Sequence, residues 1–378
     1  MKPIYLDNAA TTPIDKEVID VMYQSMIDNN GNPSSTHQFG RKAKSSIETA
    51  RKNIAKHFNV SASEIIFTAG GTEADNLILF NAVTNLGVKR IITSKIEHHA
   101  VLHTVEYLHK TYGTDIVYLD VDEFGSVDLQ QLEGLLAEEN SPKTLVSLLF
   151  VNNEVGNILP MKKVANICKQ NNAYFHSDTV QGIGYLDLDL QEISVDFIVA
   201  SAHKFHGPKG VGFAFFRKGN GIQPILHGGN QEKGARSSTE NVHAILGMEI
   251  ALDLALKNRV EKEQKIKNLK SYFINELKSN FPEVTFNGLS ADLEKSSYKV
   301  LSVRFPVENS MLLFSLDLAG IAVSGGSACQ SGSSKGSHVL QAFLNEEESK
   351  KTSVRFSFSK YTSKEEIDKT IHKLKELL

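Results

Sequence analysis

A lysine between two apolar segments is the residue whose surroundings point most directly to chemistry. Lys204 lies in the small and polar stretch 201–210, between the apolar runs 195–200 and 211–216, which we predict to be buried strands. Most lysines are solvated, but burial lowers the pKa of a lysine, and a neutral amine can form a Schiff base with an aldehyde. Pyridoxal phosphate is such an aldehyde, and it needs a carboxylate near its ring nitrogen.

A suitable carboxylate stands at the end of another predicted strand. Residues 173–178 read as a strand that closes on Asp178, followed by the stretch Thr-Val-Gln at 179–181. A carboxylate buried at a strand end needs a cationic or hydrogen-bonded partner. A protonated pyridine nitrogen would be such a partner, so Asp178 is a candidate for holding the cofactor ring.

Glycines at a predicted strand-to-helix junction offer an anion site. Residues 64–68 read as a strand, and the stretch 69–76 opens a helix with two adjacent glycines and Thr72. Backbone N–H groups at the positive end of a helix dipole bind anions, and the Thr72 hydroxyl adds a donor. A simple tight turn is the alternative reading. The nucleotide-binding pattern GxxxxGK[ST] does not follow here.

Polar side chains follow two further predicted strands. The strand 90–94 leads to His98 and the adjacent His99, which point to different faces of a helix and make a poor metal pair. Stacking of one of them on a flat cofactor is the better interpretation. The strand 144–151 runs into the polar stretch 152–156, at the strand end where open α/β sheets place ligands.

Cys329 lies in a segment of a different kind. From 324 to 337 nearly every residue is small or polar, so we expect an accessible, mobile loop. An accessible thiol without a packing role favours chemistry, whereas Cys168, on a predicted helix, reads as a packed, inert thiol. Arg355 lies in a predicted strand and either binds a carboxylate bidentately or is a surface or ion-pair arginine. No CxxC pair suggests zinc, so we expect no metal.

Composition restricts the class of protein. The chain has 378 residues, 22% charged and 41% hydrophobic, with a formal charge of −3, which is ordinary for a globular enzyme. This charge gives no reason to expect nucleic acid or an anionic membrane as the main partner. The N-terminus lacks the apolar core of a signal peptide, and no apolar run approaches the length that spans a bilayer. We therefore expect a cytoplasmic protein.

Strands and helices alternate from 64 to 216, which predicts βαβ units and a mostly parallel sheet. The stretch 242–279 reads as a long helical connection, and residues 284–378 read as a smaller α+β domain. We place a large domain at 15–257 and a small one at 1–14 and 258–378.

Taken together, these motifs resemble those of the NifS/IscS-like cysteine desulfurases, within the fold type I pyridoxal-phosphate enzymes of the class V aminotransferase superfamily. The resemblance spans nearly the whole chain and implies a large domain with a mostly parallel seven-stranded sheet and a smaller α+β domain. It is carried by TAGGTEADN (68–76), VNNEVG (151–156), HSDTVQG (176–182), SAHK (201–204) and SACQS (327–331).

The resemblance implies roles around the cofactor. Lys204 would carry pyridoxal 5'-phosphate and move the substrate Cα proton, Asp178 would keep the ring nitrogen protonated, and Gln181 would bond the phenolic oxygen. His98 would stack on the ring and belong to the catalytic groups. The phosphate would be held by Gly71, Thr72, Ser201, His203 and, from the partner subunit of a homodimer, Thr239.

It also implies the substrate and the reaction. Asn153, which also belongs to the cofactor site, and Arg355 would bind the carboxylate of L-cysteine, with Asn8 near it. The Cys329 thiolate would attack the substrate sulfur and become a persulfide, leaving alanine. The sulfur would pass to an acceptor protein, an iron–sulfur scaffold or a thiolation carrier. The alternatives are another class V enzyme, an aminotransferase or selenocysteine lyase, and a non-catalytic scaffold that kept the fold.

Overall fold

A seven-stranded sheet forms the centre of the larger part of the molecule. The computed structural model describes residues 3–326 and 336–378. The strand order is β2-β8-β7-β6-β5-β3-β4, and within this sheet β8 alone runs antiparallel to its neighbours. The mostly parallel sheet predicted from the sequence is therefore confirmed. Its strands are β2 (Ile65–Thr68), β3 (Arg90–Ser94), β4 (Asp115–Leu119), β5 (Thr144–Ser147), β6 (Tyr174–Asp178), β7 (Phe197–Ser201) and β8 (Gly212–Phe216).

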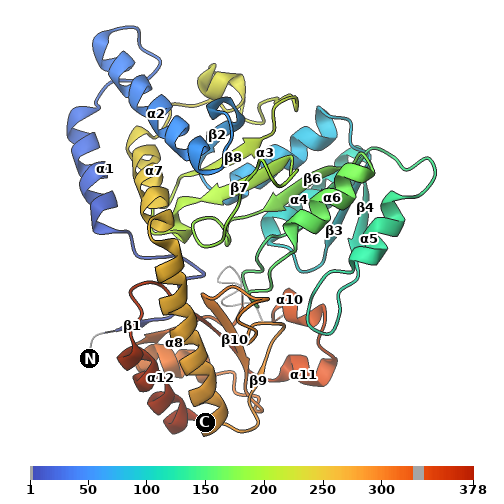
Figure 1. Cartoon of the computed structure of the whole chain (residues 1–378), viewed down its shortest axis with the longest axis vertical. Coiled ribbons are helices and arrows are strands. Elements are labelled where there is room, and N and C mark those ends of the chain that lie inside the picture. Colours follow the sequence, from blue (N-terminus) through green and yellow to red (C-terminus); the bar gives the residue numbers. More distant parts are fainter. Residues whose placement is uncertain (1–2, 327–335) are drawn as a thin grey trace.

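Alternating side chains bury both faces of this sheet. On β7, Phe197 and Val199 join one apolar cluster and Ile198 joins the other. Helices α3 and α4 cover the first face, and helices α2, α6 and α7 cover the second (Figure 1). The helices of this part are α1 (Lys16–Asp28), α2 (Gln38–His57), α3 (Gly71–Thr84), α4 (His99–Tyr112), α5 (Leu129–Leu136), α6 (Met161–Gln170) and α7 (Val242–Leu256).

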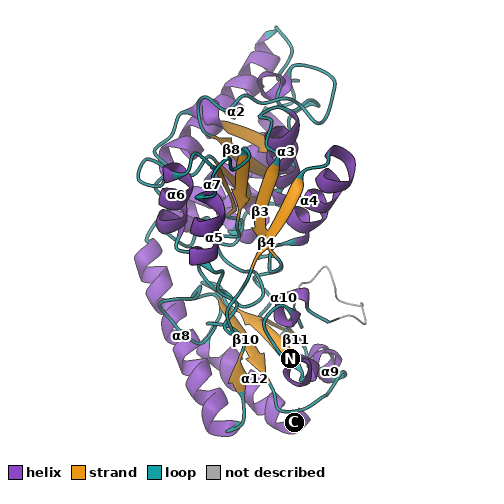
Figure 2. Cartoon of the chain, turned by 90° about the vertical axis from the view of Figure 1, so that its right-hand side faces the viewer, coloured by secondary structure: helices purple, strands orange, loops and turns teal. Residues whose placement is uncertain are grey.

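A smaller α+β part follows, also as predicted. Its antiparallel sheet has the order β12-β10-β9, and a parallel pair joins β1 to β11. Figure 2 shows α8 and α12 beside these strands. The Phe273 ring of α8 packs edge-on against Phe356 of β12, with ring centroids 4.9 Å apart. The elements are β1 (Ile4–Tyr5), α8 (Arg259–Asn280), β9 (Thr285–Phe286), β10 (Val300–Arg304), α9 (Leu312–Leu318), β11 (Ile321–Ala322), α10 (His338–Gln341), α11 (Glu346–Lys350), β12 (Ser353–Ser357) and α12 (Lys364–Leu377).

The predicted helical connection 242–279 is two helices. Asn258 between α7 and α8 takes a left-handed conformation with φ of 53°, which interrupts the helical hydrogen bonds. In Figure 1 the two helices follow one another along one side of the molecule. The larger of the apolar clusters continues from the central sheet into β10 and β12, and the domain boundaries stay a prediction.

The N-terminal segment runs from the small part into the large one. Ile4 pairs with Ile321 of β11, Asp7 bridges to Ser357 of β12, and Thr12 N donates to the carbonyl of His203. This path carries residues 9–12 past Lys204. Among the described helices none is long and apolar enough to cross a membrane.

Candidate active site

A cavity of about 880 Å³ opens at the carboxyl ends of β5, β6 and β7. This is a usual size for a small-molecule site, and parallel sheets place ligands at this edge. The cavity brings together most of the residues that the sequence singled out. The predicted residues that line it are Gly71, Thr72, His98, Asn153, Asp178, Gln181, Ser201, His203, Lys204 and Arg355.

Lys204 ends the short 3-10 helix Ala202–Lys204 that connects β7 to β8. Its ammonium Nζ donates to the carbonyl oxygens of Ala9 and Ala10, each at 2.8 Å. The Tyr185 hydroxyl donates to the Lys204 carbonyl at 2.9 Å. The lysine is therefore fixed at its backbone and at its amine, and the amine is held by acceptors from the N-terminal segment.

Asp178 is the last residue of β6 and is 4% exposed. Its Oδ1 accepts from the backbone N–H of Val180 at 2.9 Å. Burial raises the pKa of Asp178, while the charges of His98 and Lys204 act in the opposite direction. A cation placed next to this carboxyl would stabilise its ionised form.

The N-terminus of α3 forms an anion cradle. Gly70, at the N-cap, has φ of 153° and gives no side-chain cap to the helix. A Cβ on Gly71 would lie 2.7 Å from Val180 Cγ2, so the backbone approaches the neighbouring turn as closely as only glycine allows. Ser201, whose Oγ lies near Gly70, borders the same space. The uncapped amides and the helix dipole suit a phosphate.

His98 and His203 have fixed rings. His98 caps α4, because its Nδ1 accepts from the backbone N–H of Ala100 at 3.1 Å, and burial lowers its pKa. His203 Nδ1 lies 3.1 Å from Thr11 Oγ1, and burial with the nearby Lys204 charge lowers its pKa to about 4. Both imidazoles are therefore neutral at pH 7, and a neutral ring can lie against a flat cofactor.

Gln181 has one satisfied and one unsatisfied amide atom. Its Nε2 donates to the Ala9 carbonyl at 2.9 Å, which is the same oxygen that Lys204 contacts. Its Oε1 is buried without a hydrogen-bond partner within the described part of the chain. An unpaired buried amide oxygen is costly, so a donor from a bound molecule fits this position.

Arg355 is a buried arginine at the far wall of the cavity. One terminal nitrogen donates to Asp7 Oδ1 and the other to the Asn153 carbonyl, both at 2.9 Å. Its Nε is buried and has no partner among the described residues. The alternative of a surface arginine is therefore wrong, and Asp7 is a partner that the sequence did not reveal.

Two predicted residues lie outside this cavity, and a third is not among the described residues. Asn8 is buried beside β12, where its Nδ2 donates to the Ser357 carbonyl at 2.8 Å, and it does not line the cavity. Thr239 is exposed and lines a small neighbouring hollow with Ala69 and Gly210. Cys329 falls outside the described residues. Cys168 is buried on α6, and burial raises its pKa, as expected for an inert thiol.

Two buried acids near Asp178 were not predicted. Asp75 lines the cavity, and its Oδ1 lies 3.3 Å from His176 Nε2. Glu97 accepts from the Ser94 hydroxyl at 2.8 Å and from the Leu149 N–H at 3.0 Å. Burial raises the pKa of Glu97 to about 8 and raises that of Asp75 well above its ordinary value. Burial therefore favours the protonated form of both acids beside Asp178.

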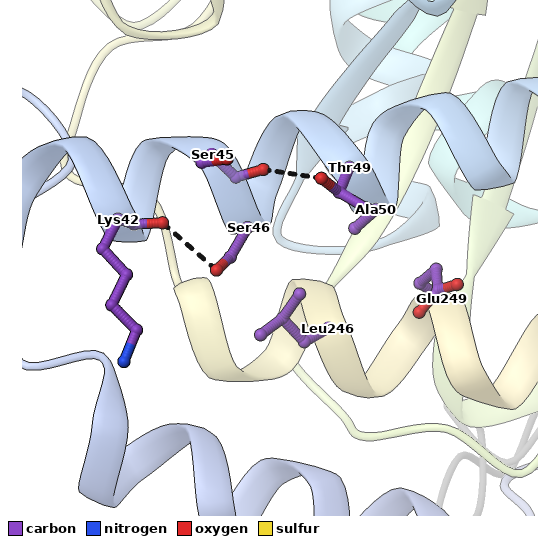
Figure 3. A pocket seen from close by; sticks show the side chains of 7 residues that line it. All are labelled: Lys42, Ser45, Ser46, Thr49, Ala50, Leu246 and Glu249. Atoms are coloured by element: carbon purple, nitrogen blue, oxygen red, sulfur yellow. Dashed lines mark hydrogen bonds between the residues drawn. The ribbon is translucent and has the colours of Figure 1, made fainter.

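Figure 3 shows a second hollow, between α2 and α7. Its Ser46 hydroxyl donates to the Lys42 carbonyl at 3.2 Å, and its Thr49 hydroxyl donates to the Ser45 carbonyl at 2.9 Å. These hydroxyls are thus bonded within their own helix and do not converge on a ligand. We assign this hollow no function.

The cavity as a whole fits pyridoxal phosphate. It offers an anion cradle at α3, an amine on Lys204, a buried carboxyl on Asp178 and an unsatisfied amide oxygen on Gln181. These are the groups that the phosphate, the aldehyde, the ring nitrogen and the ring hydroxyl require.

Comparison with known proteins agrees with this chemistry. Residues 4–370 match the family model described as Aminotransferase class-V. The chain is 41% identical over its whole length to cysteine desulfurase IscS of Dictyoglomus turgidum, and covers 95% of that protein. A solved NifS-like protein superposes with a TM-score of 0.90 at 37% identity, covering 99% of both chains. A structure titled SspA in complex with cysteine superposes with a TM-score of 0.79 at 31% identity, covering 95% of this chain and all of that one.

The fold and the cavity are those of a pyridoxal-phosphate enzyme of the class V aminotransferase family. Within this family the chain belongs to the cysteine desulfurases.

Proposed function

We propose that this enzyme converts L-cysteine to L-alanine and transfers the sulfur to Cys329. The convergence of Lys204, Asp178 and the α3 N-terminus on one cavity is the observation that supports the proposal most. The complex of a similar protein with cysteine supports the choice of substrate. Arg355 supports it further, because a buried guanidinium suits an amino-acid carboxylate.

The cofactor supplies an aldehyde for the substrate amine and a ring that accepts electrons from Cα. Asp178 holds the proton on the ring nitrogen, and Gln181 and His98 fix the ring plane. The Lys204 amine would hold the cofactor aldehyde in the resting enzyme and would move the substrate Cα proton during the reaction. The carbonyls of Ala9 and Ala10 lie 2.8 Å from that amine and keep it beside the reacting carbon.

Arg355 and Asn153 orient the substrate. The guanidinium already pairs with Asp7, and its Nε is buried without a partner among the described residues. A substrate carboxylate therefore completes the hydrogen bonding of a charged group that water does not reach, which favours binding in one orientation. Asn8 would lie near this carboxylate, with its Nδ2 bonded to the Ser357 carbonyl and its Oδ1 buried without a partner among the described residues.

Sulfur transfer then proceeds through Cys329. Its thiolate attacks the substrate sulfur, a sulfur–sulfur bond forms, and the Cβ–S bond breaks. The electron pair of that bond stays on the carbon fragment, which takes up a proton and leaves as alanine. Gly326 and Ser337, which lie on either side of this stretch, meet beside Glu154, the residue after Asn153 of the cavity.

The protein would act as a homodimer in the cytoplasm. Thr239 from a second copy would complete the phosphate site, since it is exposed and does not line the cavity of its own chain. The sulfur acceptor would be an iron–sulfur scaffold or a thiolation carrier.

The test is alanine and sulfide production from L-cysteine by the wild type, Lys204→Ala and Cys329→Ala. We expect Lys204→Ala to lose both products and Cys329→Ala to lose sulfide while it retains the cofactor absorbance. Desulfuration retained in Cys329→Ala would remove that residue from the mechanism. Release of selenide but not sulfide, or amino transfer to a keto acid, would indicate the alternative class V activities.

A further inference from the structure

The glycine-rich loop 228–241 is held in place by two ion pairs and is exposed near its C-terminal end. Ser238 and Thr239 are exposed, and Ser238 has φ of 93°, a conformation that L residues rarely adopt. Glu232 and Lys233 are also left-handed, with φ of 48° and 58°. Such conformations persist where the surroundings fix them, so the loop has a defined shape.

The first fastening is a buried ion pair between Glu232 and Arg51 of α2. The two terminal guanidinium nitrogens donate to the two carboxylate oxygens at 2.6 and 2.8 Å. The side chains are 4% exposed on Arg51 and 1% exposed on Glu232. A bidentate pair out of water holds both partners in one geometry.

This pair also closes the open edge of the central sheet. β2 is an edge strand, and its Phe67 N–H and Ile65 carbonyl have no neighbouring strand on that side. Glu232 accepts from the Phe67 N–H and Arg51 donates to the Ile65 carbonyl, both at 2.9 Å. These hydrogen bonds therefore fix the position of the loop relative to β2, the strand that leads into the anion cradle.

A second ion pair fastens the far end of the loop. Arg236 donates to both carboxylate oxygens of Glu73, at 2.7 and 3.2 Å. Glu73 lies in the first turn of α3 and also accepts from the Ala69 N–H at 2.8 Å. The loop that carries Thr239 is thus attached to α3, the helix whose N-terminus forms the anion cradle. Thr239 itself does not line the cavity of its own chain.

From these contacts we propose that Arg51 and Glu232 are positioning residues that present Thr239 to the phosphate site of a second copy of this chain. The inference rests on the proposed function, in which that site binds pyridoxal phosphate. The buried pair fixes the loop, and the loop acts on the other protomer's cofactor and not on its own.

The direct test is cofactor affinity in Glu232→Gln, which keeps the shape and the hydrogen-bond acceptor but removes the charge. We expect pyridoxal phosphate to bind about tenfold more weakly, as for one lost hydrogen bond to a charged group. Pyridoxal, which lacks the phosphate, should bind as it does to the wild type. Glu192→Gln is the matched control, because it breaks an exposed ion pair with Lys162 far from the site.

Mixed dimers separate presentation in trans from a local effect. Lys204→Ala and Glu232→Gln are placed either on the same chain or on opposite chains, and doubly tagged dimers are purified. Absorbance of the Lys204-bound cofactor then reports the one site with an intact lysine. We expect weaker binding when both changes share a chain, because the intact site then receives the altered loop. With the changes on opposite chains the affinity should match that of the wild type.

The reverse pattern, or equal losses in the two arrangements, would overturn the inference, as would a wild-type protein that is monomeric by light scattering. Should Glu232→Gln fail to fold, Arg236→Met replaces it in the same two mixed dimers. The Arg236–Glu73 ion pair is partly exposed, so its loss is better tolerated by the fold. If the mixed dimers behave as we expect but the wild type produces no sulfide from L-cysteine, the proposed function is contradicted and this inference stands.

Discussion

Asp75, Glu97 and Asp178 bring three carboxyl groups under one cavity, all of them almost fully buried. Burial raises the pKa of all three, and the charge of Asp178 raises the pKa of Asp75 and of Glu97 further. Of the three, Asp178 is the one whose pKa is lowered by the nearby Lys204 charge, against the effect of its burial. The protonated form is therefore favoured at Asp75 and Glu97, and the ionised form is favoured most at Asp178.

Glu97→Gln tests this distribution of charge through pH. The folded pKa of Glu97 is about 8 and its ordinary value is 4.5. The folded state therefore binds more protons between these values, and stability falls as pH rises from 4.5 towards 8, by at most about 1.4 kcal/mol per pH unit. The cofactor-free variant should have a flatter melting temperature across this range in calorimetry. Equal slopes for both proteins would contradict a neutral Glu97.

The sequence alone identified Lys204 and Asp178, because their flanking apolar runs show that they follow buried strands. It did not reveal Asp7, which meets Arg355 across 348 positions of chain. Nor did it reveal that Asn8, next to Asp7, turns away to β12. Contacts of this range depend on the path of the N-terminal segment, which local patterns do not encode.

At the scale of elements, the start of α3 depends on glycine. Gly71→Ala would place a Cβ 2.7 Å from Val180 Cγ2. We expect a stability loss of about 1–3 kcal/mol from overpacking, together with weaker binding of the phosphate-bearing cofactor.

The control for this change is Gly134→Ala in α5, where an added Cβ meets nothing within 4 Å. Helix propensity predicts a gain of up to about 1 kcal/mol there. Denaturant unfolding and cofactor titration measure both variants. An unchanged cofactor affinity in a destabilised Gly71→Ala protein would mean that the cradle does not hold the phosphate.

Element boundaries followed the sequence where an apolar run ended at a turn signal. The predicted strand 90–94 is found with those limits. The run 144–151 is assigned as strand only to Ser147, although the N–H groups of Leu148 and Phe150 still donate to the carbonyls of His176 and Asp178 on β6. Apolar composition alone cannot distinguish a buried strand from the buried segment that follows it.

At the scale of the whole molecule, Asp15 joins the two parts. It is 2% exposed at the start of α1, and its carboxylate accepts from Lys360 and from the Tyr361 hydroxyl, just beyond β12. Lys360→Met leaves this buried carboxylate without its cation, so we expect a loss of about 2–3 kcal/mol in unfolding free energy.

Lys350→Met provides the comparison, since its exposed pair with Glu346 is worth at most about 1 kcal/mol. Chemical denaturation followed by tyrosine fluorescence and circular dichroism measures both. Similar losses in the two variants would show that Asp15 does not tie the parts together.

The central claim is that sulfur passes from cysteine to Cys329, and intact-mass spectrometry after brief incubation with L-cysteine tests it most directly. We predict a gain of one sulfur atom, about 32 Da, that maps to Cys329 and is reversed by reductant. Absence of this adduct, with the cofactor absorbance still present, would contradict the account and leave Cys329 an ordinary thiol.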